Sequence, residues 1–121
     1  MCIRDSGTTI TTNALLEMRG AKVGLMITKG YRAIQEIQNQ ARDGNLFDYF
    51  YAKPVPIAPQ SLTREIAERS DYLGNVLVDL DRAAVRRAAR ELAAEGVQSI
   101  AVCYLFSFMN PAHENLSLIH I

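Results

Sequence analysis

The chain has 121 residues, of which 49% are hydrophobic and 21% are charged. This composition supplies enough apolar side chains for a core and excludes an intrinsically disordered chain. Thirteen basic residues balance thirteen acidic ones, so no net charge favours nucleic acid or an anionic membrane. No apolar stretch approaches the roughly 20 residues that span a bilayer, and the first residues lack a signal-peptide core. We therefore expect a cytoplasmic protein that binds neither nucleic acid nor a membrane.

The first and last six residues form an unusual pair. Residues 1–6 can be encoded as ATG TGT ATA AGA GAC AGT, and residues 116–121 as CTG TCT CTT ATA CAC ATC. Apart from one terminal base in each, these strings are reverse complements, and they resemble the inverted transposon end used to prepare sequencing libraries. We predict that both ends are translated adapter, that residues 7–115 are the native fragment, and that the ends contribute little to stability.

The first predicted element is a helix that follows Gly7. Thr8 or Thr9 is expected to cap it, because threonine hydroxyls accept hydrogen bonds from free backbone N–H groups. Gly20 stands where a glycine commonly follows the last helical turn. The apolar face of this helix is predicted from four residues at helical spacing, namely Ile10, Ala14, Leu15 and Met18.

A strand and a second helix are expected next. Residues 21–28 are apolar and alternate, which predicts a strand that leads into a turn. A helix is expected over residues 31–41, with Ile34 and Ile37 on its apolar face and a break at residues 43–45.

An extended crossing and a hairpin are expected in the middle of the chain. Three prolines in residues 46–60 exclude a long helix or a central strand there. Residues 62–69 and 76–80 flank a loop in which Gly74 and Asn75 are candidates for positive φ, and this pattern predicts a hairpin.

The last third of the chain carries the strongest signals. Asp81 is expected to cap a helix over residues 82–95, which Gly96 ends. Residues 97–108 are almost continuously apolar, which is typical of a strand buried on both faces. Asn110, followed by proline, begins another helix. The order of elements predicts an α/β fold with helices against a mostly parallel or mixed sheet and one hairpin.

Five residues are candidates for ligand binding. Gly7, Thr8 and Thr9 at a helix start offer N–H groups and hydroxyls suited to a phosphate, a carboxylate or an oxyanion, or they form a simple cap. Asn13 lies one turn further and either orients a ligand or is solvated. Lys29 follows a strand, where α/β sheets bind ligands, or is a solvated charge in a turn.

His113 is the candidate catalytic residue. It lies in the first turn of the last helix, where it can donate to a substrate, while Glu114 complements the helix dipole. Cys103 lies within the apolar run and is expected to be a buried, inert thiol. The cysteine spacing indicates no metal site. We interpret the remaining basic cluster as a solvated helix face with ion pairs rather than a nucleic-acid surface; it comprises Arg82, Arg86, Arg87 and Arg90.

Short motifs spread over residues 7–115 match one family in order and approximate spacing. They include GTTITTNALLE at residues 7–17, GAKVGL at 20–25, ITKGYR at 27–32, NQAR at 39–42, LFD at 46–48, KP at 53–54, ER at 68–69, LD at 80–81, AVC at 101–103 and NPAHE at 110–114. Together they resemble the N-terminal region of the hydantoinase A and 5-oxoprolinase family.

This resemblance implies an incomplete subdomain of the actin-like ATPase fold. It implies a parent enzyme that hydrolyses a cyclic amide such as hydantoin or 5-oxoproline, in which ATP phosphorylates the amide oxygen and water then opens the ring. The alternative is ATP-dependent carboxylation of a ketone, as in acetone-carboxylase-type enzymes. ATP and Mg²⁺ are the implied cofactors of the parent, and a hydantoinase B-type subunit or fused domain is the implied partner.

The same resemblance places the nucleotide site outside the chain. The acidic, glycine-rich phosphate loop of the family is expected upstream of Gly7, and the remaining nucleotide-binding half after Asn115. We therefore expect the isolated chain to bind no cofactor and to be catalytically inactive.

Overall fold

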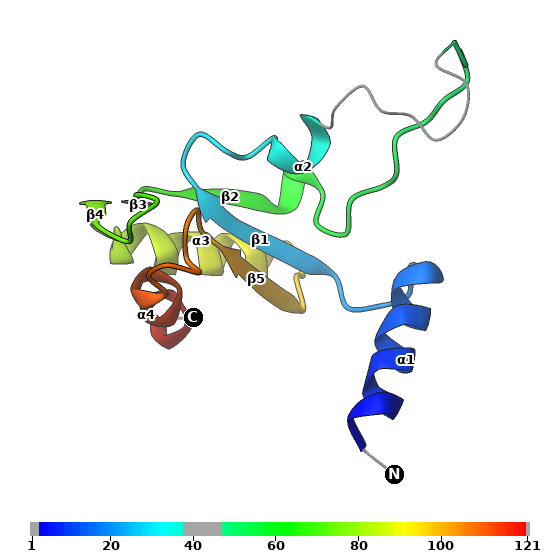
Figure 1. Ribbon diagram of the computed structural model, residues 1–121, viewed down its shortest axis with the longest axis horizontal. Helices are drawn as coiled ribbons and strands as arrows, with labels where there is room; N and C mark the ends of the chain where they lie inside the picture. The colour runs from blue at the N-terminus through cyan, green and yellow to red at the C-terminus, as the bar shows by residue number, and fades with distance from the viewer. Residues whose placement is uncertain (1–2, 38–46, 121) are drawn as a thin grey trace.

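A three-stranded parallel sheet is the centre of the structure, a computed structural model that describes residues 3–37 and 47–120 (Figure 1). Strand β1 (Val23–Thr28) lies between β2 (Thr63–Ile66) and β5 (Ser99–Cys103). The registers are parallel on both sides, with Leu25 opposite Thr63 in β2 and Ala101 in β5. A parallel sheet whose strands are separated by helices confirms the expected α/β class.

Strand β1 is buried on both faces rather than on one. Every residue from Gly24 to Thr28 is buried, because β1 is the central strand. On one face Met26 packs against Ile66 and against the helix formed by residues 82–94. On the other face Leu25 and Ile27 pack with Ala58 from the proline-rich crossing.

Helix α3 (Arg82–Ala94) follows the predicted pattern at both ends. The Asp81 side chain accepts a hydrogen bond from the backbone N–H of Ala84 at 2.9 Å. At the other end Gly96 has a φ of 76°, and the N–H of Val97 donates to the carbonyl of Leu92 at 3.1 Å. The buried stripe of the helix faces the sheet and consists of Ala84, Val85, Ala88 and Leu92.

A glycine in β1 allows this helix to come close to the sheet. A Cβ atom added to Gly24 would lie 3.0 Å from both methyl carbons of Leu92 and 3.2 Å from a methyl of Val97. Those distances are shorter than ordinary van der Waals contacts. The absence of a side chain at residue 24 is therefore part of how α3 packs on β1.

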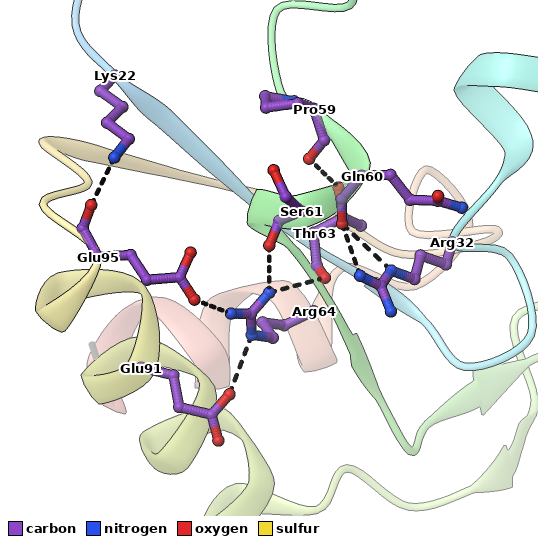
Figure 2. Close-up of polar contacts among 9 residues, drawn as sticks. All are labelled: Lys22, Arg32, Pro59, Gln60, Ser61, Thr63, Arg64, Glu91 and Glu95. Atoms are coloured by element: carbon purple, nitrogen blue, oxygen red, sulfur yellow. Dashed lines mark hydrogen bonds and ion pairs between the residues drawn. The ribbon is translucent and has the colours of Figure 1, made fainter.

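Arg64 of β2 joins the sheet to the polar side of α3 (Figure 2). Its guanidinium donates to Glu91 at 2.9 Å, to Glu95, and to the backbone carbonyl of Ser61 at 2.7 Å. Glu91 and Glu95 of α3 thus pair with Arg64 from a neighbouring strand, and ion pairs made by the arginines of the helix itself stay a prediction. The four arginines of the helix are exposed.

Helix α1 (Ile3–Leu16) begins earlier and ends earlier than expected. It starts before Thr8 and Thr9, so neither residue lies at its N-terminus. It ends in a Schellman motif, in which the N–H of Arg19 donates to the carbonyl of Ala14 at 2.9 Å. The left-handed residue of this motif is Met18, with a φ of 50°, and not Gly20. The prediction of a glycine stop was therefore wrong, because the left-handed position falls at Met18, two residues before Gly20.

Helix α2 (Ile34–Ile37) is a single turn. Ile34 and Ile37, predicted to face a core, are 48% and 69% exposed because no element covers them within the described residues. The rest of the predicted helix and its break at residues 43–45 lie outside the described residues. Residues 47–59 contain neither helix nor strand, as expected for the crossing, and the short 3₁₀ helix η1 (Gln60–Leu62) follows.

The predicted hairpin is smaller than expected. Strand β2, intended as its first arm, joins the parallel sheet because Ile66 packs into the core against α3. Only β3 (Arg69–Ser70) pairs antiparallel with β4 (Val76–Val78). Gly74 in the connecting loop has a φ of 87°, as predicted, whereas Asn75 does not have a positive φ.

Strand β5 is an edge strand, so the expectation of burial on both faces was wrong. Ile100 and Val102 pack against the core on the α3 side, while Ser99, Ala101 and Cys103 on the other face are exposed. Cys103 is therefore an exposed free thiol and not a buried one.

Helix α4 (Ala112–His120) starts as predicted but does not stop at residue 115. The Asn110 side chain accepts a hydrogen bond from the N–H of Ala112 at 3.1 Å. Ser117 is fully buried, and its hydroxyl lies 2.9 Å from that of Tyr104. Ser117, one of the last six residues, thus packs against the rest of the chain, and the small contribution of the two ends to stability stays a prediction. No helix within residues 3–37 and 47–120 is long and apolar enough to cross a membrane.

Candidate functional site

The candidate site residues predicted from the sequence fall into two separate groups. Gly7, Thr8, Thr9 and Asn13 lie on α1, beside the end of the sheet at which β1 begins (Figure 1). Lys29 follows directly after the last residue of β1 and is exposed. The structure therefore does not bring the α1 residues and Lys29 together.

The geometric premise for the first group was also wrong. The free N–H groups of a helix belong to its first four residues. Because α1 begins at Ile3, Gly7, Thr8 and Thr9 lie within the helix and do not present its free N–H groups. Thr9 and Asn13 are exposed. A binding role for these residues remains a prediction.

The second group lies at the carboxyl edge of the parallel sheet. Thr28 is the last residue of β1, Glu68 comes two residues after β2, and Tyr104 follows β5 directly. Because parallel strands end at the same edge, these three residues meet there. Helix α4 places His113 at this edge as well.

A buried chain of hydrogen bonds links three of these residues. The Thr28 hydroxyl is bonded to Oε1 of Glu68, and Oε2 of Glu68 lies 2.8 Å from Nδ1 of His113. Thr28 is 1% exposed, Glu68 3% and His113 6%. A buried carboxylate is costly without partners, and here both of its oxygens have one. The chain therefore fixes the His113 ring relative to the end of β1.

The other ring nitrogen of His113 is not used in this way. The side chain of His113 bonds to the described residues through Nδ1 alone. No buried side-chain nitrogen or oxygen in the described part of the chain lacks a partner. Nε2 is therefore not fully enclosed, although the His113 side chain as a whole is only 8% exposed.

Neighbouring polar groups complete the edge. Glu114 accepts a hydrogen bond from the N–H of Tyr104 at 3.2 Å, so it does more than complement the dipole of α4. Burial raises the pKa of Tyr104 to about 12, and the hydrogen bond from Ser117 opposes this effect. Tyr104 is therefore a neutral hydroxyl at ordinary pH.

The sequence pointed to His113 but missed its two partners. Thr28 was assigned only to the end of a strand, and Glu68 only to a polar arm. A polar residue at or just after the end of a parallel strand is the signal that can identify both. In the described ranges, no three His, Cys, Asp or Glu side chains come together so as to hold a metal ion.

The parallel sheet and the polar groups at its carboxyl edge place the chain among α/β proteins, which commonly bind small molecules at that edge. More specifically, the chain belongs to the family described as the hydantoinase/oxoprolinase N-terminal region, whose family model matches residues 5–117.

Individual relatives agree with this assignment. The chain is 34% identical to caprolactamase subunit alpha of Pseudomonas jessenii over 119 residues, covering 98% of this chain and 17% of that protein. The crystal structure of the ATP-dependent caprolactamase from the same organism superimposes with a TM-score of 0.79 at 33% identity, over 89% of this chain and 16% of that one. A nucleotide-free structure of acetone carboxylase gives a TM-score of 0.75 at 26% identity, over 88% and 17%.

These similarities confirm the expected family and the α/β subdomain of the actin-like type. The chain spans about one sixth of the length of these relatives.

Proposed function

We propose that the parent of this chain is an ATP-dependent enzyme that hydrolyses a cyclic amide. The observation that carries the proposal is 34% identity to caprolactamase subunit alpha over nearly the whole chain. An amide carbon is a poor electrophile, and transfer of a phosphoryl group from ATP to the amide oxygen makes it reactive toward water. Water then adds to this carbon, and the ring opens when the C–N bond breaks.

In this proposal His113 is the catalytic residue that takes a proton from the attacking water. Its Nε2 is not fully enclosed at the carboxyl edge of the sheet, and its Nδ1 is held by Glu68. An imidazole held in this way is suited to general base catalysis near neutral pH. Lys29, exposed beside Thr28, supplies a positive charge for an anionic group at the same edge.

A separate role is proposed for α1, where Gly7, Thr8, Thr9 and Asn13 contact a phosphate or the substrate in the assembled parent. The variant Thr9→Val, made in the parent, keeps the branched shape and removes the hydroxyl. If Thr9 binds a charged group, kcat/KM falls roughly tenfold to a hundredfold. A change of less than about threefold, about 0.7 kcal/mol, contradicts this role.

ATP and Mg²⁺ are proposed to bind mainly to parts of the parent outside this chain. The isolated chain is accordingly proposed to be inactive. Because the similar caprolactamase chain is a subunit, we propose a partner of the hydantoinase B type, as a subunit or a fused domain, and a cytoplasmic location where ATP is available.

The alternative function is ATP-dependent carboxylation of a ketone. It is favoured by the similarity to acetone carboxylase, whose structure superimposes almost as well as that of caprolactamase. Identity alone does not separate the two classes, because the gamma subunit of acetophenone carboxylase is 35% identical to this chain. The similarity to caprolactamase subunit alpha covers more of the chain, 98% against 88%, and makes cyclic-amide hydrolysis the first choice.

The deciding experiment is to recover the source gene with its neighbours and to express the parent with its partner. We expect release of ADP to be stimulated by caprolactam, hydantoin or 5-oxoproline, and the 121-residue chain alone to give no turnover. Stimulation only by acetone with bicarbonate supports the alternative, and stimulation by neither class contradicts both. The same gene sequence tests our proposal that residues 1–6 and 116–121 are translated adapter.

A further inference from the structure

We propose that Glu68 and Thr28 are positioning residues that hold His113 in one tautomer, with the hydrogen on Nδ1 and the lone pair of Nε2 facing outward. This inference rests on the proposed function, because it explains how His113 becomes a proton acceptor. It concerns two residues that were not among the candidate site residues predicted from the sequence.

The hydrogen bond from the backbone of Leu105 determines which groups donate and which accept in the chain of hydrogen bonds. Its N–H can only donate, and it donates to Oγ1 of Thr28 at 3.0 Å. The hydroxyl hydrogen of Thr28 is therefore free to point at Oε1 of Glu68, the other partner of that hydroxyl. Glu68 receives this hydrogen as an acceptor, as a carboxylate does.

The second oxygen of Glu68 completes the argument. An ionised carboxylate can only accept, so Oε2, which lies 2.8 Å from Nδ1 of His113, requires a hydrogen on that nitrogen. In a neutral imidazole the other nitrogen then carries the lone pair. Nε2 is not fully enclosed, so the lone pair is open to a substrate or a water molecule.

The position of the three residues supports a role beyond packing. Thr28 and Glu68 come from the ends of two adjacent parallel strands, and His113 comes from the first turn of α4. The carboxylate therefore connects the central strand of the sheet to the helix that carries the imidazole. When the base shares a proton with a catalytic water, Glu68 also stabilises the imidazolium that forms.

The proton transfer is balanced in this scheme. Nε2 of His113 takes one hydrogen from water as the water oxygen bonds to the activated amide carbon. The imidazolium then gives a proton to the ring nitrogen as the C–N bond breaks, which returns His113 to its starting state. The second water hydrogen passes to solvent as the C=O bond re-forms, and the resulting acyl phosphate is cleaved by a second water to give the carboxylate and phosphate. Glu68 and Thr28 lose and gain no proton in either step.

The first test is nitrogen-15 NMR of the histidine side chains in the 121-residue chain, at a pH where the imidazoles are neutral. We expect the hydrogen of His113 on Nδ1, and His113→Gln assigns the signal because His120 is the other histidine of the chain. A hydrogen on Nε2 of His113 overturns the inference. This measurement needs no substitution in Thr28 or Glu68 and no enzymatic activity.

The second test uses Glu68→Gln, which keeps the size of the side chain but removes its charge. Acylation of His113 by diethyl pyrocarbonate, measured relative to His120, is expected to slow about tenfold. Thr28→Val is expected to slow it by a smaller factor, and the control Thr28→Ser, which keeps the hydroxyl, by less than about twofold. Circular dichroism checks that each variant is folded, and unchanged acylation in a folded Glu68→Gln overturns the inference.

The third test is made in the parent enzyme. Glu68→Gln is expected to lower kcat about tenfold or more with little change in KM, because the contact acts on the proton transfer and not on substrate binding. Loss of only stability, with kcat per folded enzyme unchanged, contradicts the positioning role. If the parent lacks ATP-dependent amide hydrolysis but the tautomer is as expected, the proposed function fails and the geometry of the histidine stands.

Discussion

Helices α1 and α3 end in the same way but are embedded very differently. Both close with a Schellman motif, with Met18 as the left-handed residue in α1 and Gly96 in α3. Yet α3 buries a stripe of four residues against the sheet, whereas no α1 residue from Thr9 onward is buried. An open, largely apolar cavity of 260 Å³ lies beside the end of α1 and is lined in part by Leu15, Met18 and Ile57.

This difference shows that the end of a helix is determined by local sequence, whereas its burial is determined by distant parts of the chain. The hydrogen bonds that end a helix depend on a few neighbouring residues, so they form wherever the local sequence permits. Burial depends on a partner surface, and of these two helices only α3 has one within the described residues. We therefore expect substitutions in α3 to change the stability of the whole fold, and equivalent substitutions in α1 to have only local effects.

The largest difference is expected between Leu92→Ala and Leu15→Ala. Leu92 is fully buried beneath α3, and its truncation should lower the free energy of unfolding by about 2 to 5 kcal/mol. Leu15 is 52% exposed, and its truncation should cost less than about 0.5 kcal/mol. Urea denaturation of the two variants measures both values. Equal losses would mean that α1 is as firmly packed as α3.

A second pair of variants tests the close approach of α3 to β1. Gly24→Ala places a methyl against Leu92 and Val97, and we expect a loss of about 1 to 3 kcal/mol from overpacking. Gly20→Ala is the matched control, because nothing lies within 4 Å of the added methyl and its φ is not positive. The control should be neutral or slightly stabilising. A neutral Gly24→Ala would show that Leu92 can move without cost.

The N-terminal cap of α3 gives a smaller effect. Asp81→Ala removes the acceptor for the N–H of Ala84 and should cost about 1 kcal/mol. Asp79→Ala, two residues earlier and exposed, is the control for loss of a negative charge and should change stability by less than about 0.5 kcal/mol. Thermal unfolding compares the two, and an equal shift in both would attribute the effect to charge alone.

The smallest effect concerns the two left-handed residues. Met18→Gly relieves a positive φ that a methionine adopts at a cost. The substitution should leave the local stability of the end of α1 unchanged or raise it by about 0.5 to 1 kcal/mol at most. Gly96→Ala imposes the same strain on α3 and should lower global stability by about 1 kcal/mol. Amide hydrogen exchange resolves the two helix ends separately. Destabilisation by Met18→Gly would show that the methionine side chain holds the end of α1.

The elements that sequence reasoning identified correctly are those with local causes. Asp81 and Gly96 define α3 by their own hydrogen bonding and φ, and the prolines exclude regular structure from the crossing. The errors arose where long-range pairing decides. Strand β2 has a polar sequence but joins the sheet through Ile66, and the apolar strand β5 lies at an edge. Neither position in the sheet is encoded within the strand itself.

The candidate site shows the same limit. His113 was a candidate from the sequence because its place in the first turn of a predicted helix can be read from neighbouring residues. Glu68 and Thr28 were not, because their importance depends on a parallel register that brings the ends of β1 and β2 together. The exposure of Cys103 follows from the same unpredicted strand order.

The parallel pairing of β1 also has a consequence for the order in which the chain folds. Val23 pairs with Ser99, so the central strand cannot gain its second neighbour until residues near the end of the chain have left the ribosome. Closing such long loops makes folding slow, since their entropy is lost before the contacts are gained. Helix α3 carries its own start and stop signals, but its apolar stripe must wait for that sheet. During synthesis, the apolar residues of β1 and α3 therefore stay exposed until β5 has emerged and paired with β1.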